Sequence, residues 1–403
     1  MKKLFQNRNI TFLWFGQVIS QSGDTIYQLA LIWLALELSS SKSIAGLIAM
    51  SAYLPAMFLS LPAGVIADHY DRKRIMLIAD VFRAVIILGI PFAHYMGLLT
   101  PSWLAINAFL IASAASFFNP SRDAIVPQLV PRDGLLRANS LIQTSWQLSM
   151  FLGPAVAGFI LDRLGIINLF TLDSLAYIVS FFAVLMLRPS HVEREKTDSN
   201  IKEMTHKILD GLKFARRNPI IFPLLLFTVV DNLFIMGPAI IGTPVMVREV
   251  LHGDASQYAI IMSCYAVGML LGTAVLLLFC KNLPKGKLLL LGMTMDGLTF
   301  VPYFFVRSFE GMIVVTLFHS LVIPFLTVSR TSIIQEVVPE KMTGRVFSLI
   351  GLAVVGLTAV SSGLTGIILD LIPVTTLFLI IGFAAGTVGF LGWIFAKSLR
   401  MYH

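Results

Sequence analysis

Charge and cysteine are both scarce in this 403-residue chain. Only 13% of the residues are charged and 57% are hydrophobic, so the chain cannot present an ordinary charged surface to water. The two cysteines, Cys264 and Cys280, fall on one apolar segment without loops that would pair them, which argues against a disulfide framework or a metal site. These scarcities point to a chain that lies in a membrane.

Motifs typical of enzymes are also lacking. The sequence holds no Gly-Lys-Ser/Thr loop that would cradle a phosphate, no His pair at metal-ligand spacing and no soluble segment large enough for an ATPase domain. We therefore expect neither an enzyme nor a bound cofactor or metal. A transporter with this sequence would draw its energy from an ion gradient.

Long apolar segments make up most of the chain, and about 20 apolar residues suffice for one membrane-spanning helix. The first segment is too long for the core of a signal peptide, so we expect the N-terminus to remain attached. The fold class is therefore predicted to be all-α and integral to the membrane. Twelve spans are predicted, at 10–38, 43–67, 75–97, 102–127, 138–162, 166–188, 219–247, 256–280, 287–306, 309–336, 344–370 and 373–397.

The second half of the chain repeats the first about 208 positions later. Residues 121–125 read SRDAI and residues 329–333 read SRTSI, while 158–162 read GFILD and 366–370 read GIILD. Such a duplication of apolar segments is typical of transporters and predicts two six-helix bundles, at 1–188 and 219–403, around a central pathway. The connector 189–218 is predicted to be a cytoplasmic linker with an amphipathic helix on the inner leaflet.

The net charge of +8 follows a topological pattern. With the N-terminus placed inside, only four of the 30 Lys and Arg residues fall in outer loops, namely Lys42, Arg163, Arg248 and Arg307. This is the positive-inside bias, so we expect both termini to be cytoplasmic, in a bacterial-type inner membrane. The basic residues then face anionic lipids, and no nucleic-acid partner is needed to explain them.

The loop between the second and third spans, residues 64–74, reads GVIADHYDRKR. It resembles the cytoplasmic signature of the major facilitator superfamily, although Asp71 stands where glycine is usual. In this arrangement Gly64 lets two helices approach closely, and Asp68 would meet the positive end of the helix that begins near Arg345. We predict that a cytoplasmic gate is formed by Gly64, Asp68, Arg72, Arg122, Arg330 and Arg345.

A second set of residues is spread over most of the chain. It consists of Gln17, Ser20, Gly23, Asp24, Ala79, Asp80, Arg83, Asn119, Pro120, Arg122, Val130, Pro131, Ala138, Asn139, Gly344 and Arg345. In these residues the chain resembles the macrolide-efflux branch of the drug:proton antiporters, which also includes siderophore exporters. The resemblance implies the export of an amphipathic compound driven by protons.

The first span gives a separate argument. Gln17, Gln21, Asp24 and Gln28 follow helical spacing and form one polar face on an otherwise apolar helix. An ionised Asp at mid-membrane costs about 2.5–3.5 kcal/mol on insertion scales, so Asp24 should face a water-filled cavity or a partner. Asp231 lies at nearly the equivalent depth of the seventh span, and we predict that Asp24 and Asp231 couple transport to protons. The alternative is that these polar groups only hold helices together.

Other residues are assigned to the pathway and to packing. We predict a cavity lined by polar, aromatic and flexible apolar side chains, although a lone histidine such as His319 is more often a buried hydrogen-bonding residue. Small residues and a proline would allow close helix packing at Gly153, Pro154, Gly158, Gly268 and Gly272. The predicted cavity residues are Gln17, Gln21, Gln28, Gln143, Trp146, Gln147, Asn232, Phe234, Met236, Phe318 and His319.

Three further polar features are interpreted as structural. Asp80 and Arg83 are three residues apart and can neutralise each other. Asp173 and Asp296 are carboxylates that belong to no apparent polar face, and each is expected to have a packing role.

The sequence favours a monomeric, proton-coupled exporter of drugs or amphipathic small molecules that works by alternating access. Its partners would be the substrate, protons and membrane lipids. Two alternatives stay open: an exporter of a siderophore, lipid or lysolipid, and a membrane sensor or scaffold that transports nothing.

Overall fold

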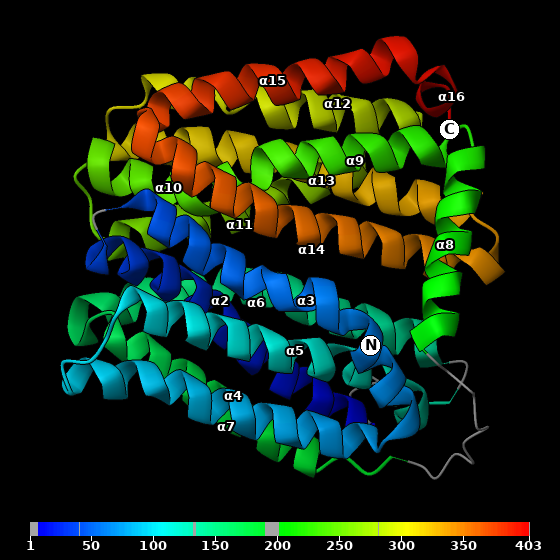
Figure 1. Ribbon diagram of the computed structural model, residues 1–403. Coiled ribbons are helices and arrows are strands. Elements are labelled where there is room, and N and C mark those ends of the chain that lie inside the picture. The colour runs from blue at the N-terminus through cyan, green and yellow to red at the C-terminus, as the bar shows by residue number, and fades with distance from the viewer. Residues whose placement is uncertain (1–6, 40, 132–133, 190–200, 281, 403) are drawn as a thin grey trace. The chain divides into compact units, whose positions relative to one another are not determined.

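The computed structural model describes residues 7–39, 41–131, 134–189, 201–280 and 282–402. These residues are almost entirely helical (Figure 1). The predicted segment 190–200 of the linker lies outside the described residues. The helices are α2 Arg8–Leu38, α3 Lys42–His69, α4 Arg72–Tyr95, α5 Pro101–Leu129, α6 Leu135–Leu164, α7 Ile167–Leu185, α8 Ile201–Arg217, α9 Ile221–Gly237, η2 Pro238–Gly242, α10 Thr243–Val245, η3 Met246–Val250, α11 Ala255–Phe279, α12 Lys285–Leu298, η4 Val301–Phe305, α13 Phe309–Val337, α14 Glu340–Leu371, α15 Val374–Phe395 and α16 Lys397–Arg400.

Each of the twelve predicted spans corresponds to a helix or a run of joined helices. Eleven of these are long and apolar enough to cross a membrane, and the remaining one, α2, is 31 residues long but more polar. Its polar face explains the difference, because Gln17, Gln21 and Asp24 interrupt every stretch of apolar residues near its middle. The predicted all-α membrane fold is confirmed, and the least apolar span is the one with the predicted pathway face.

The predicted seventh span is less regular than expected. It continues from α9 through the two π-helical segments η2 and η3, which flank the short α10. Pro238 and Pro244 lie at the first turns of η2 and α10. Proline lacks the N–H that would continue an α-helical ladder, so the chain adopts wider turns here.

The chain divides into two compact units, Met1–Leu38 with Ser51–Met204, and Ser39–Met50 with Thr205–His403. In the first unit α2 packs against α6 and α7, and α4 packs against α5 and α7, as the side-by-side ribbons of α4, α5 and α7 show (Figure 1). In the second unit the equivalent pairs recur: α9 contacts α14 and α15, and α12 contacts α13 and α15. The sequence repeat is therefore also a repeat of helix packing.

The second unit includes the start of α3. Asp370, at the end of α14, accepts hydrogen bonds from the backbone N–H groups of Lys42 (2.8 Å) and Ser43 (3.1 Å). The hydroxyls of Ser41 and Ser43 donate to the same carboxylate at 2.7 and 2.5 Å. The carboxylate thus caps the free N–H groups at the N-terminus of α3.

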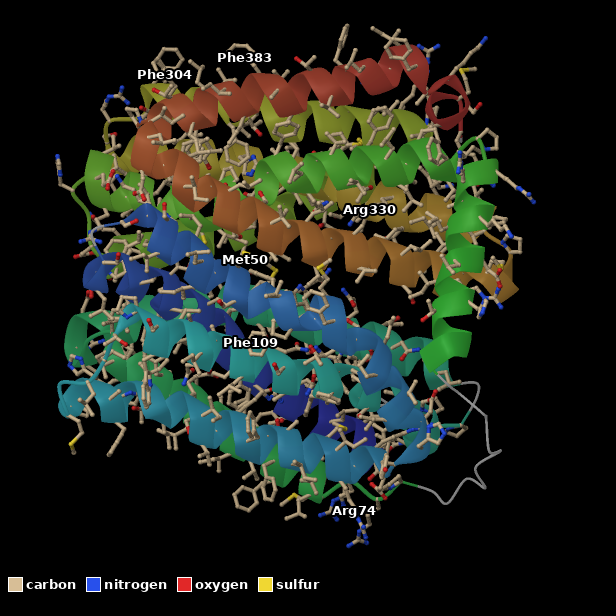
Figure 2. The ribbon with its side chains drawn as sticks, viewed as in Figure 1. Met50, Arg74, Phe109, Phe304, Arg330 and Phe383 are labelled. Carbon is tan, nitrogen blue, oxygen red and sulfur yellow. The ribbon has the colours of Figure 1, made fainter. Side chains whose placement is uncertain are left out.

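Apolar side chains also cover the outside of the helices. Phe383 on α15 is 56% exposed and points away from its helix (Figure 2). Such exposure would be costly in water but suits contact with lipid.

Candidate functional site

A cavity of about 430 Å³ lies within the first unit, between α2, α4, α5 and α6. Its wall is rich in amide, hydroxyl and charged groups, which is unusual among helices of such apolar composition. The lining residues are Gln17, Ser20, Gln21, Asp24, Arg83, Phe118, Asn119, Arg122, Ile142, Gln143 and Trp146.

The polar face of α2 forms one side of this cavity. Gln21 donates from Nε2 to Oε1 of Gln17 at 3.2 Å, and Arg122 donates from Nη1 to the same oxygen at 3.1 Å. Ser145 on α6 donates to Oε1 of Gln21 at 2.8 Å. The amides are therefore held in fixed orientations by neighbouring helices.

Two of the predicted cavity residues are outside this wall. Gln28 on α2 and Gln147 on α6 are exposed, but neither belongs to the lining. Gln28 is one turn beyond Asp24, past the end of the cavity. Gln147 is adjacent to the lining residue Trp146 and one turn beyond the lining residue Gln143.

Asp24 connects the cavity to a buried group of charges. Its Oδ1 accepts a 2.5 Å hydrogen bond from the hydroxyl of Tyr177 on α7. The guanidinium carbon of Arg83 is 4.3 Å from the ring centroid of Tyr177 and 4.4 Å from that of Phe118. Asp24 also interacts electrostatically with Arg83 and Arg122. The carboxylate thus lies near two cations and one hydroxyl donor.

The predicted pair of Asp80 and Arg83 is confirmed. Arg83 donates from Nη2 to Oδ1 of Asp80 at 2.5 Å, and Ser180 donates to the other carboxylate oxygen at 2.8 Å. Arg83 also lines the cavity, so the pair is part of the site and more than a packing element.

Asp173 on α7 is fully buried next to this cluster. A Cβ placed on Gly23 of α2 would be 2.2 Å from its Oδ1, so only glycine fits at that position. Neither carboxyl oxygen of Asp173 has a hydrogen-bond partner among the described residues. The expectation that Asp173 belongs to no polar face was wrong, because Asp173, Tyr177 and Ser180 are four and three residues apart and all are buried.

The second unit holds a different group of polar residues. Asp231 on α9 is buried and interacts electrostatically with Asp296 and Arg330. Arg330 lies on α13 (Figure 2). Asn232 donates to the carbonyl oxygen of Thr228 on its own helix at 2.8 Å. Asp231 is therefore within electrostatic range of a second carboxylate and a cation.

His319 differs from the prediction that it lines the cavity. It is 3% exposed, its Nδ1 is 2.8 Å from the hydroxyl of Thr299, and its ring packs on Phe300 with centroids 4.6 Å apart. This is the buried hydrogen bond that the sequence left open. Among the apolar candidates Phe318 is 56% exposed, whereas Phe234 and Met236 are half-buried on α9.

The predicted gate residues of the first unit lie at the ends of α3, α4 and α5. Gly64 is half-buried and Asp68 is exposed in the last turn of α3. Arg72 donates to the carbonyl oxygens of Ala67 (3.3 Å) and Ala124 (3.1 Å), which ties α4 to its neighbours. Arg122 lines the cavity and forms an ion pair with Asp123 at 2.9 Å. The contact of Asp68 with the start of α14 stays a prediction.

Three of the five predicted packing residues fall at close helix contacts. A Cβ on Gly153 of α6 would be 1.8 Å from Oγ1 of Thr25 on α2. Cβ atoms on Gly268 and Gly272 of α11 would be 1.9 Å from Oγ of Ser320 and 2.0 Å from the carbonyl oxygen of Leu321 on α13. Pro154 is buried and Gly158 is half-buried on α6, and their packing role stays a prediction.

Several site residues were not singled out as site residues from the sequence. Tyr177, Ser145, Ser20 and Asn119 line the cavity or bond to residues that do. The periodicity of Asp173, Tyr177 and Ser180 was a usable signal for α7. Nothing in the sequence pairs Tyr177 with Asp24, because the two are 153 residues apart.

Comparison with known proteins agrees with this architecture. Residues 4–398 match the family model described as transmembrane secretion effector. Macrolide efflux protein A of Streptococcus pyogenes is 29% identical over 84% of this chain and 84% of its own length. A putative bacilysin exporter of Bacillus subtilis is 25% identical over 91% of this chain and 90% of its own.

Solved structures show the same fold at low identity. The crystal structure of the nucleoside transporter NupG superposes with a TM-score of 0.78 at 12% identity and covers 98% of this chain and 100% of that one. The likeness at this identity concerns the fold alone. With the family match over nearly the whole length, the chain belongs to the transmembrane secretion effector family, a group of membrane transporters within the major facilitator superfamily.

Proposed function

We propose that the protein is a proton-coupled exporter of amphipathic small molecules. The observation that carries this proposal is the position of Asp24, which lines a 430 Å³ cavity and accepts a hydrogen bond from Tyr177 beside Arg83. The names of the relatives, a macrolide efflux protein and a putative bacilysin exporter, support export as the direction of flux.

The cavity has the chemistry to bind an amphipathic solute. Trp146 and Phe118 supply aromatic surface, while Gln17, Gln21 and Gln143 offer amide donors and acceptors. A few fixed polar groups in a partly apolar site orient a ligand without demanding one exact shape. Arg122 adds a cation that would favour a substrate with an anionic or strongly accepting group.

Asp24 would carry the proton. When its carboxyl is ionised, Tyr177 donates to Oδ1 and Arg83 balances the charge; when it is protonated, Arg83 keeps Asp80 as its partner. The cavity wall therefore differs in charge between the two forms, and so does its affinity for substrate. Alternating access would use this difference to exchange substrate for proton. Asp231, beside Asp296 and Arg330, is the corresponding candidate in the second unit.

The experiment is flux through reconstituted vesicles. Substrate-induced proton flux is measured for macrolides, dyes, siderophores and lysolipids, in wild type, Asp24→Asn and the control Asp162→Asn, which changes an exposed carboxylate at the end of α6. We expect one class of compound to elicit flux that Asp24→Asn abolishes while binding survives and Asp162→Asn does not alter it.

Other outcomes favour the alternatives. If only siderophores or lysolipids elicit flux, the substrate is one of these compounds and not a drug. Substrate flux that ignores the proton gradient would remove the coupling role of Asp24. The absence of flux with every compound, together with loss of a bound partner in Asp24→Asn, would favour a sensor or scaffold.

We further propose that the protein is a monomer in a bacterial-type inner membrane with both termini in the cytoplasm, and that it needs no cofactor beyond the proton gradient. The distribution of Lys and Arg among the loops supports this orientation. Cysteines introduced in the loops and labelled from one side of the membrane would test this orientation.

A further inference from the structure

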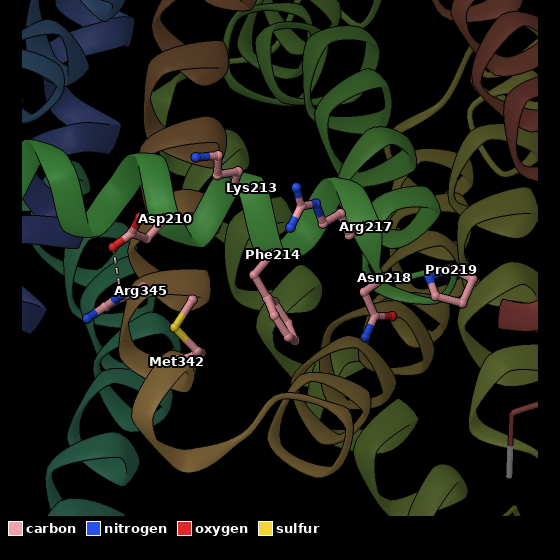
Figure 3. Close-up of a pocket in the computed structure, with 8 residues that line it drawn as sticks. All are labelled: Asp210, Lys213, Phe214, Arg217, Asn218, Pro219, Met342 and Arg345. Carbon is pink, nitrogen blue, oxygen red and sulfur yellow. Dashed lines mark hydrogen bonds and ion pairs between the residues drawn. The ribbon is translucent and has the colours of Figure 1, made fainter.

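A second pocket lies in the second unit, where the linker helix α8 meets α14. Its volume is about 480 Å³. Figure 3 shows side chains of α8 on one side and Arg345 and Met342 of α14 on the other. The lining residues are Asp210, Lys213, Phe214, Arg217, Asn218, Pro219, Met342 and Arg345.

The pocket is held by packing between α8 and the second unit. Ala215 is fully buried in an apolar cluster with Ile221 and Val346, and Phe214 packs against that cluster. A Cβ on Gly211 would be 3.1 Å from Cβ of Arg345, so α8 lies very close to α14. This part of the linker is therefore fixed on the protein, and the pocket has a rigid apolar base.

The charges of the pocket are unbalanced. Arg345 forms an ion pair with Asp210 at 3.1 Å, drawn as a dashed line in Figure 3. Lys213 and Arg217 have no hydrogen-bond or ion-pair partner among the described residues. Three cations and one carboxylate leave a surplus of positive charge over an apolar base of Phe214, Pro219 and Met342.

We propose that this pocket binds a phosphate group, and that the phosphate belongs to the headgroup of an anionic membrane lipid. Lys and Arg are the side chains that proteins use for phosphate, and the planar guanidinium of Arg217 suits two of its oxygens. The apolar base would contact the glycerol and the first methylenes beside that phosphate.

A membrane source is favoured over a free phosphate by the rest of α8. Leu209 and Leu212 are 53% and 51% exposed on the same helix that carries Lys213 and Arg217. A helix with exposed leucines and adjacent cations is typical of segments that lie at a membrane surface. The predicted cytoplasmic position of this helix places it at the leaflet that is rich in anionic lipid. This proposal does not depend on which solute is exported.

The test measures lipid binding by native mass spectrometry of the full-length protein in detergent. Wild type is titrated with phosphatidylglycerol, phosphatidylcholine, glycerol 3-phosphate and inorganic phosphate. The variant is Lys213→Gln with Arg217→Gln, and the matched control is Lys287→Gln with Lys397→Gln, two exposed cations of the same unit outside the pocket. Thermal unfolding establishes whether both variants are folded. If the double pocket variant does not fold, Lys213→Gln alone replaces it.

We expect wild type and control to bind phosphatidylglycerol in preference to phosphatidylcholine. The pocket variant should bind phosphatidylglycerol roughly 25-fold more weakly, at about fivefold for each of the two cations removed. Equal weakening in the control would show general surface attraction and overturn the proposal, as would equal binding of the two lipids or no change in the pocket variant. Binding of glycerol 3-phosphate as tight as that of the lipid would keep the phosphate site but overturn its lipid source.

Discussion

The hydroxyl of Tyr177 donates a 2.5 Å hydrogen bond to Oδ1 of Asp24, across 153 residues of sequence. This contact joins α7 to α2 at the wall of the cavity, and it connects the polar face predicted on α2 with the buried charges of α4. Asp24 thus depends on a partner from outside its own helix.

Replacing Tyr177 by Phe removes this donor and keeps the ring under Arg83. A hydrogen bond to a charged group contributes about 1.5–3 kcal/mol, so substrate-driven proton flux should fall roughly 10- to 100-fold. Tyr303→Phe is the matched control, because it removes a buried hydroxyl that bonds to the neutral Thr316 of the second unit. Equal losses in both variants would assign the effect to packing.

Arg83→Leu should destabilise the protein strongly. It leaves Asp80 buried with an unpaired charge, which costs about 3–5 kcal/mol. The double variant Asp80→Leu with Arg83→Leu should recover most of that stability, while transport stays low because Arg83 no longer balances Asp24. Thermal unfolding in detergent and vesicle flux measure the two effects. If the double variant is stable and transports at the wild-type rate, the pair of Asp80 and Arg83 has only a packing role.

Gly153→Ala should weaken the contact of α6 with α2, since the new methyl group would overlap Oγ1 of Thr25. Overpacking of this kind costs about 1–3 kcal/mol. Gly351→Ala on α14 is the control: no atom lies within 4 Å of its Cβ position, and alanine favours a helix over glycine by about 1 kcal/mol. Melting temperatures should move in opposite directions, and a neutral Gly153→Ala would mean that α6 can shift freely.

Asp173→Leu should leave stability unchanged or improve it, because it removes a buried carboxyl that has no hydrogen-bond partner among the described residues. The relief is about 1–3 kcal/mol for one unsatisfied polar group. Asp173→Asn keeps the shape and an unpaired polar group, so it should gain less. Chemical or thermal unfolding of both variants checks this order. A large loss of stability in Asp173→Leu would contradict this expectation and reveal a stabilising partner of the carboxyl.

Periodicity was the most productive signal in the sequence. Spans follow from runs of apolar residues, and the face of Gln17, Gln21 and Asp24 follows from helical spacing, so both were predicted correctly as local features. The i, i+3 pair of Asp80 and Arg83 was found for the same reason. The same spacing on α7, from Asp173 to Ser180, is a weaker signal, because a tyrosine and a serine count little as polar residues in an apolar span.

Long-range relationships could not be predicted in this way. No sequence pattern predicts that Arg122 bonds to Gln17 in the cavity, because the distance between α5 and α2 depends on packing. His319 was assigned to a cavity, yet Thr299 and Phe300 enclose it. A lone histidine in an apolar helix has no other polar residues at helical spacing, so the sequence does not indicate which side chains it contacts.

The cap that Asp370 provides for α3 bears on the order in which this protein is made. Ser41 and Asp370 are separated by 329 residues, so the start of α3 leaves the ribosome long before its capping carboxylate exists. Chains fold from the N-terminus during synthesis, and contacts between distant residues form late. The first turn of the second membrane helix can therefore be capped only after nearly the whole chain has been synthesised. A truncated protein that ends before α14 would leave that turn uncapped.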